Sequence, residues 1–116
     1  MSVYQYDVIR CDKDLALKIL TATDIKPDFI TKMYDDSIYL SWETWHGSPF
    51  PDFEYLLTQD VPYLYGGENE GLEAWCELSS LAPKHWEDEV CVTDEGFDFI
   101  KHGTKISLDE LKEMES

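Results

Sequence analysis

The residue types most often used in nucleophilic and metal chemistry, cysteine and histidine, each occur three times: Cys11, Cys76, Cys91, His46, His85 and His102. No Cys-x-x-Cys pair and no His-Glu-x-x-His frame is present, so the spacing does not predict a metal site. A catalytic Cys and His meet in space rather than in sequence, so a nucleophile pair remains an alternative. It would combine Cys76 or Cys91 with His85 or His46. The negative field of the chain would raise the thiol pKa, which counts against this pair.

Carboxylates, the ligands that Mg²⁺ and Ca²⁺ prefer, are numerous, but no run has the spacing of an EF-hand. Asp94-Glu95-Gly96 is the nearest approach to a calcium loop. Gly66-Gly67 is not followed by Gly-Lys-Ser/Thr or by a helix start, so it does not predict a phosphate-binding loop. No motif predicts a metal or another cofactor, and the chain is not expected to be an enzyme.

The acids are concentrated in residues 68–98, where ten acids face one base, Lys84, for a local net charge of −9. Alternate residues of a strand share a face at about 6.7 Å spacing. A strand here can therefore carry a row of carboxylates with the pitch of a polyphosphate backbone. We predict that a basic partner binds Glu68, Glu70, Glu73, Glu77, Trp86, Glu87, Asp88, Glu89, Asp94, Glu95 and Asp98.

Aromatic side chains alternate with these acids at Tyr63, Tyr65, Trp75 and Trp86. Aromatic residues are typical anchors at the centres of interfaces, and they are also typical of protein cores. We favour a core position for Trp75. Trp86 lies in a polar segment, and for this residue the sequence leaves core and interface open.

The overall charge narrows the class of partner. The 116 residues include 25 Asp and Glu against 9 Lys and Arg, for a net charge of −16. A direct nucleic-acid binder needs Lys and Arg to replace phosphate counterions, and the single arginine is Arg10. Anionic membranes are disfavoured by the same repulsion, and no apolar run approaches about 18 residues. The expected partner is therefore a basic protein.

Composition also bounds the architecture and the compartment. Hydrophobic residues make up 43% of the chain and aromatics 14%, which favours one folded domain over 1–116 rather than an acidic tail. The first residues lack the basic and apolar regions of a secretory signal. Three widely spaced cysteines are typical of reduced, buried thiols. We expect a cytoplasmic protein.

The first half of the chain is predicted to form a strand, a helix and a hairpin. Residues 3–10 alternate in polarity as a half-buried strand does. Asp12 can cap a helix that should end near Thr23, ahead of Pro27. Two β-rich runs, 29–34 and 38–45, flank three turn-forming residues and predict a hairpin.

The second half continues this pattern with a helix and further strands. We predict a helix over 51–59, a strand over 61–65, a loop over 66–71, and a strand over 72–78. An irregular stretch then leads to a hairpin formed by 90–92 and 97–100. A capping box at Ser107 predicts a short final helix.

This order gives an α+β fold with the ferredoxin-like order β-α-β-β-α-β. Its sheet should be covered by two helices on one face and extended by C-terminal strands and a short terminal helix. No internal repeat or flexible linker is visible.

The run Ile38-Tyr39-Leu40-Ser41-Trp42-Glu43-Thr44-Trp45-His46-Gly47-Ser48-Pro49-Phe50-Pro51 is an aromatic strand followed by a small residue, a proline and a helix. With the order of elements, it resembles the YubB ferredoxin-like family over about residues 3–78. That family consists of small proteins encoded by enterobacterial plasmids and phages. The resemblance implies an origin on a mobile element and supplies no catalytic residues.

Three functional hypotheses follow from these features. The first is an inhibitory binding protein of a phage or plasmid, of the anti-CRISPR or anti-restriction type. It would mask the basic nucleic-acid-binding surface of a host defence protein, with nucleic-acid mimicry as one way of doing so. The alternative is an immunity protein that neutralises a basic nuclease toxin. A small enzyme that depends on Cys and His is a distant third.

Overall fold

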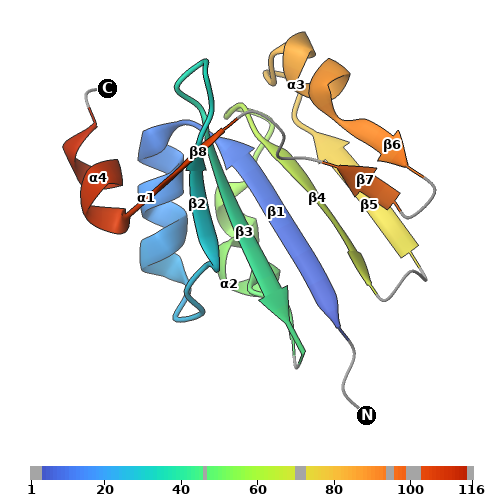
Figure 1. Ribbon diagram of the computed structural model, residues 1–116, viewed down its shortest axis with the longest axis horizontal. Coiled ribbons are helices and arrows are strands. Elements are labelled where there is room, and N and C mark those ends of the chain that lie inside the picture. Colours follow the sequence, from blue (N-terminus) through green and yellow to red (C-terminus); the bar gives the residue numbers. More distant parts are fainter. Residues whose placement is uncertain (1–3, 46, 70–72, 94–95, 99–102, 115–116) are drawn as a thin grey trace.

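Six strands form one antiparallel sheet in the order β5-β4-β1-β3-β2-β8 (Figure 1). The computed structural model describes residues 4–45, 47–69, 73–93, 96–98 and 103–114. The strands of this sheet are β1 (Gln5–Cys11), β2 (Phe29–Lys32), β3 (Ile38–Thr44), β4 (Leu64–Asn69), β5 (Glu73–Leu78) and β8 (Thr104–Ile106). A separate hairpin is formed by β6 (Cys91–Thr93) and β7 (Gly96–Asp98).

Four helices pack around this sheet, together with one short 3-10 turn. They are α1 (Lys13–Ala22), α2 (Phe50–Phe53), the 3-10 turn η1 (Glu54–Leu56), α3 (Lys84–Glu89) and α4 (Leu108–Glu113). The result is a compact α+β globule with a radius of gyration of 13.5 Å. A domain of this length is expected to have a radius of about 13 Å.

The alternation of side chains along β1 divides the core into two parts, because successive residues of a strand point to opposite faces. On what we call the Ile9 face, Ile9, Leu40 and Tyr65 belong to the larger cluster, which also holds Leu15 of α1, Phe53 of α2 and Leu111 of α4. On the Val8 face, Val8, Tyr39 and Leu64 pack with Trp86 of α3. α1, α2 and α4 therefore pack on the Ile9 face, which agrees with the two helices predicted on one face. The Val8 face carries α3, a helix that the sequence did not predict.

Several predicted elements are confirmed. The side chain of Asp12 accepts a hydrogen bond from the backbone N–H of Leu15 at 2.8 Å, and α1 ends at Thr23. The hairpin of β2 and β3 is present, and Asp36 in its turn has a positive φ of 67°, a conformation that Asp tolerates. At the C-terminal end, Ser107 and Glu110 form the predicted capping box of α4. The hairpin of β6 and β7 is also formed, although Ile100 lies outside the described residues.

Two predictions about β4 and its approach are wrong. The helix expected over 51–59 is only the single turn of α2 followed by η1. The loop expected over 66–71 is strand as far as Asn69. A Cβ added to Gly67 would lie 2.0 Å from the carbonyl oxygen of Tyr6 and 2.7 Å from the ring of Trp75. Glycine therefore allows close packing in β4 and does not mark a turn.

The sequence analysis did not predict α3 or β8. α3 lies in the stretch expected to be irregular, and β8 adds the outer edge of the sheet beside β2. β7 contacts β4 and β5, and Figure 1 shows it lying over β5. Within the described residues, no helix has both the length and the apolar character needed to cross a membrane.

Candidate functional site

A buried arginine joins α3 to the sheet. Arg10, on the central strand β1, is fully buried on the Val8 face. Its guanidinium lies over two aromatic rings, 5.3 Å from the centroid of Tyr39 and 5.0 Å from that of Trp86. Stacking of this kind suits a planar, weakly hydrated cation. The arginine is thus enclosed by the sheet on one side and by α3 on the other.

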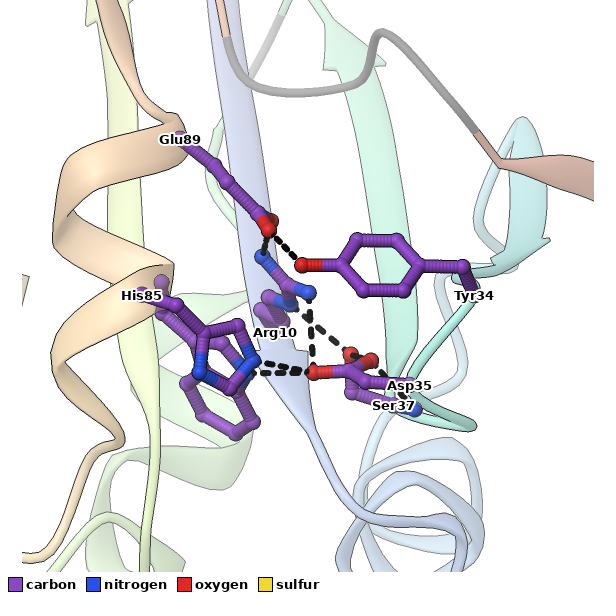
Figure 2. A network of polar contacts seen from close by, with 7 residues as sticks. Arg10, Tyr34, Asp35, Ser37, His85 and Glu89 are labelled. Atoms are coloured by element: carbon purple, nitrogen blue, oxygen red, sulfur yellow. Dashed lines mark hydrogen bonds and ion pairs between the residues drawn. The ribbon is translucent and has the colours of Figure 1, made fainter.

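Each of the three nitrogens of this guanidinium donates a hydrogen bond (Figure 2). Its Nε donates to the hydroxyl of Ser37 at 2.8 Å, and its Nη1 donates to Glu89 at 2.7 Å. Its Nη2 donates to Asp35 Oδ2 at 3.1 Å. Since each nitrogen donates to a partner and the side chain is fully buried, the only arginine of the chain is not available to a phosphate or another ligand.

Asp35, in the turn between β2 and β3, is the centre of this cluster. Besides Arg10, its Oδ2 receives the indole N–H of Trp86 at 2.9 Å and lies 2.7 Å from Nε2 of His85. Its Oδ1 accepts from the backbone N–H of Ser37 at 3.0 Å. Partial burial favours a higher pKa for Asp35, but the hydrogen bonds from Ser37, His85 and Trp86 outweigh burial and hold it far below the usual value.

Glu89, at the C-terminal end of α3, completes the cluster. It accepts hydrogen bonds from Arg10 and from the hydroxyl of Tyr34. Burial alone would raise the pKa of Glu89, but these two hydrogen bonds and the charge of Arg10 lower it. Both carboxylates are therefore ionised at neutral pH and fix α3 in place.

Next to this cluster lies a cleft of about 560 Å³ with an acidic rim. The start of α1 supplies Asp12 and Asp14, and the turn between β2 and β3 supplies Asp35 and Asp36. Apolar groups also line the cleft: Pro62, Leu81, Pro83, Trp86 and Met114. Lys13 is the one lysine among the lining residues, which also include His85, and its ammonium donates to the carbonyl oxygen of Met114. The cleft thus offers carboxylates and an apolar wall to a cationic side chain.

The residues predicted to bind a partner do not all lie together. Glu70, Asp94 and Glu95 lie outside the described residues, and of Glu73 and Asp98 only the backbone is described. Glu77 faces Tyr65 across the ladder, whereas Glu68 faces Ala74 three positions further along β4, so these two acids are on opposite faces of the sheet. A single flat partner surface cannot contact both.

The predicted residues of α3 differ in their accessibility. Glu87 and Asp88 are exposed, and Asp88 makes an ion pair of 3.7 Å with Lys84. Glu89 is half-buried and holds Arg10. Trp86 is only 4% exposed, so it offers little surface to a partner and instead caps the guanidinium. Among the other aromatics, Tyr63 and Tyr65 are buried and Trp75 is half-buried against the core.

Of the four residues named for a nucleophile pair, only Cys76 and His85 have described side chains. His85 contacts Asp35, whereas Cys76 packs beside Trp86 in the smaller cluster, where burial raises the pKa of its thiol. Among the described residues, no three His, Cys, Asp or Glu side chains are grouped to hold a metal ion.

Sequence reasoning missed a buried polar group at the other end of the sheet. Asp7 is fully buried on the Ile9 face and accepts hydrogen bonds from the hydroxyl of Tyr65 at 2.6 Å and from Ser48 at 3.2 Å. Burial raises the pKa of Asp7, although hydrogen bonds from Tyr65, Gln5 and Ser48 partly oppose the shift. The alternation of residues 3–10 placed Asp7 on the polar side of β1, where solvent was expected.

Comparison of the chain with protein-family models, with curated proteins and with solved structures gives no significant match. A function must therefore be inferred from the residues of this chain.

Proposed function

We propose that this protein binds a basic, nucleic-acid-binding surface of another protein and masks it, as an inhibitor of the anti-CRISPR or anti-restriction type does. The observation that carries the proposal is the acidic cleft between α1 and α3. Asp12, Asp14 and Asp36 are exposed at its rim, and the one lysine in its lining is engaged with a carbonyl oxygen.

An excess of acids at one place destabilises a fold through self-repulsion, and a basic partner offsets that repulsion. Nearby, α3 adds the exposed carboxylates of Glu87 and Asp88. The pair of Lys84 and Asp88 is exposed on both sides, so it contributes little to stability and can exchange partners at low cost. Carboxylates in such numbers raise the association rate with a basic protein and make binding depend on salt.

The proposed interface differs from the set of residues that the sequence predicted, because only part of that set lies near the cleft. It combines the cleft acids with Glu87 and Asp88, and these elements are joined through the cluster of Arg10 and Asp35. Glu77 is on the opposite face of the sheet from Glu68, so at most one of the two can lie in the same contact.

We assign the fold to the ferredoxin-like class. The four strands β4-β1-β3-β2 are neighbours in that order and antiparallel, with α1 between β1 and β2 in the chain and α2 between β3 and β4. This is the order of elements that the resemblance to the YubB family implies. A fold by itself does not determine function, so the proposal depends on the acidic cleft.

Capture from a lysate of a bacterial host that carries CRISPR and restriction systems tests this proposal. The immobilised wild type is compared with the triple variant D12N/D14N/D36N, which removes three charges from the cleft. The matched control is D24N/E54Q/D60N, which removes three exposed charges elsewhere. The captured protein is identified, and its affinity for each variant is measured at two salt concentrations.

We expect the wild type to capture a nucleic-acid-binding defence protein. The cleft variant should bind it at least about tenfold more weakly, because each lost charge pair contributes up to about 1 kcal/mol. The control should bind it nearly as the wild type does. If the two variants lost the same affinity, net charge alone would explain the loss, and the cleft would be refuted as the interface. Capture of a toxin nuclease would instead support the immunity hypothesis.

A further inference from the structure

The part of the Val8 face that α3 does not cover contains a groove of about 310 Å³. Its floor is formed by cross-strand rows of the sheet. Tyr6 lies directly opposite Glu43 on β3 and opposite Glu68 on β4, so the three side chains form one row on this face. In the next row, Phe29 lies opposite Ser41. All five residues line the groove.

Two hydroxyl groups of the groove are buried and have no hydrogen-bond partner among the described residues. They are Oγ1 of Thr31 and Oγ of Ser41, in residues that are 1% and 2% exposed. A buried polar group without a partner costs roughly 1–3 kcal/mol, so such groups call for a ligand or ordered water. Both residues line the groove, although the two oxygen atoms themselves are shielded from solvent.

The charged residues that line the groove favour the binding of a cation. Asp28, Glu43 and Glu68 line it, against one base, Lys105. Neighbouring strands are about 4.8 Å apart, so Glu43 and Glu68 are separated by about 10 Å at their backbones, with Tyr6 between them. A cation above Tyr6 would therefore be attracted by carboxylates on both sides.

One cation of the chain already uses this environment. The ammonium of Lys105 lies 3.8 Å from the centroid of Phe29, over the face of the ring. Phe29 is 46% exposed, so the ring still has surface to offer. The groove thus combines aromatic faces, carboxylates and free acceptors, which are the groups that stabilise a positively charged, partly apolar side chain.

We propose that this groove is a second binding site, which takes an arginine side chain presented by a partner protein. A guanidinium is planar, stacks on aromatic faces and carries five N–H donors, whereas an ammonium has three donors and is strongly hydrated. Its donors match the carboxylates of Glu43 and Glu68. The buried hydroxyls of Thr31 and Ser41 become further acceptors once the side chains over them move apart on binding. The volume is at the lower limit of the roughly 300–1,000 Å³ of ligand pockets, so it suits one side chain.

The site is independent of the proposed masking of a nucleic-acid-binding surface. It would serve any partner that presents an arginine, and it is built from β1, β2, β3, β4 and β8 rather than from the cleft between α1 and α3. A test with a short arginine peptide needs no partner protein, so its failure would leave the proposed function standing. Failure to capture a partner protein would likewise leave this site standing.

The test uses the full chain, labelled with ¹⁵N, and the blocked peptide N-acetyl-Gly-Arg-Gly-amide. Its analogue with citrulline has nearly the same shape but no charge. We expect saturable amide shifts at Phe29, Thr31 and Ser41 with the arginine peptide and none with the citrulline peptide at the same millimolar concentrations. Equal shifts with both peptides, shifts confined to the cleft of Asp12 and Asp36, or no saturable shift would overturn the proposal.

Two variants sharpen the result. Replacing Lys105 by Met removes the internal competitor and should tighten peptide binding about threefold, in line with a cation–π contact at an exposed site. The double variant E43Q/E68Q should weaken it about tenfold. The matched control E54Q/D60N, which removes two exposed charges elsewhere, should leave it unchanged. A control that weakens binding as much as E43Q/E68Q would show a general charge effect and refute the site.

Discussion

Replacing Arg10 by Met is the sharpest test of how α3 is held. The change removes a buried cation, three hydrogen bonds to Ser37, Asp35 and Glu89, and the contacts with two aromatic rings. Met keeps much of the apolar stem, so the variant leaves no large cavity. What it leaves is a pair of carboxylates that have lost their counterion.

The loss in free energy of unfolding caused by Arg10→Met follows from the burial of these groups. Removing one partner of a buried ion pair costs about 3–5 kcal/mol. The side chains of Asp35 and Glu89 remain 19% and 27% exposed, so water can partly solvate them. We therefore expect a loss of about 3 kcal/mol, at the lower end of that range. A domain of 116 residues has a stability of roughly 6–17 kcal/mol, so the variant should still fold.

Urea unfolding, followed by the fluorescence of Trp86 and the other tryptophans, measures this loss. Arg10→Lys should lose less, about 1–2 kcal/mol, because it keeps the charge and gives up the planar fork. Lys18→Met, which removes an exposed charge from α1, is the matched control and should stay within about 0.5 kcal/mol of the wild type.

The pH dependence separates lost charge from lost packing. The pKa values of Asp35 and Glu89 are lowered in the folded state, so their contribution is present above the unfolded carboxyl pKa of about 4 and disappears as the pH falls. Without Arg10, the pKa of Glu89 moves back toward its ordinary value, and the loss of stability between about pH 5 and pH 3 becomes shallower. A variant as stable as the wild type, or one with an unchanged pH slope, would refute this account.

Three further predictions concern other parts of the molecule. Asp7→Asn should raise the urea midpoint at pH 7, because burial raises the pKa of Asp7 and its ionised form therefore destabilises the fold. In the wild type, this destabilisation should decrease as the pH falls. A lower midpoint for the variant would contradict this. Gly67→Ala should cost about 3 kcal/mol, because the new Cβ meets the carbonyl of Tyr6 at 2.0 Å; thermal unfolding that matches the wild type would show that the ladder can shift. Cys11 should resist iodoacetamide in the folded protein and react in urea, since burial raises the pKa of its thiol well above the ordinary value; mass spectrometry of labelled peptides would reveal early labelling if this is wrong.

The elements that the sequence predicted well are those with strong local signals. Asp12 and Ser107 have side chains that can cap a helix whatever the tertiary structure, and both do so. The alternation of residues 3–10 located β1, and the turn residues Asp35, Asp36 and Ser37 located the hairpin of β2 and β3. These signals act over a few residues, so one sequence is sufficient to detect them.

The elements that it missed depend on contacts between distant residues. The segment of α3 has no capping side chain and no long apolar stripe, and the helix is held by Trp86 and Glu89 against Arg10, which is more than 70 positions away. Gly67 has the local signature of a turn, yet it lies in β4 because Tyr6 and Trp75 approach it closely. No local pattern encodes either contact.

The same distinction explains why the charge could be counted from the sequence but not located. In the sequence, Arg10 is only the single arginine of an acidic chain, whereas inside the fold it forms ion pairs with Asp35 and Glu89. Burying this charge is tolerable because each of its three nitrogens donates a hydrogen bond and two aromatic rings lie close to it. The consequence for the surface is that α3 is fixed from within. Asp14, Asp36, Glu87 and Asp88 then need no role in holding the fold, whereas Asp12 also caps α1. A basic partner can bind Glu87 and Asp88 without loosening α3, the helix that presents them.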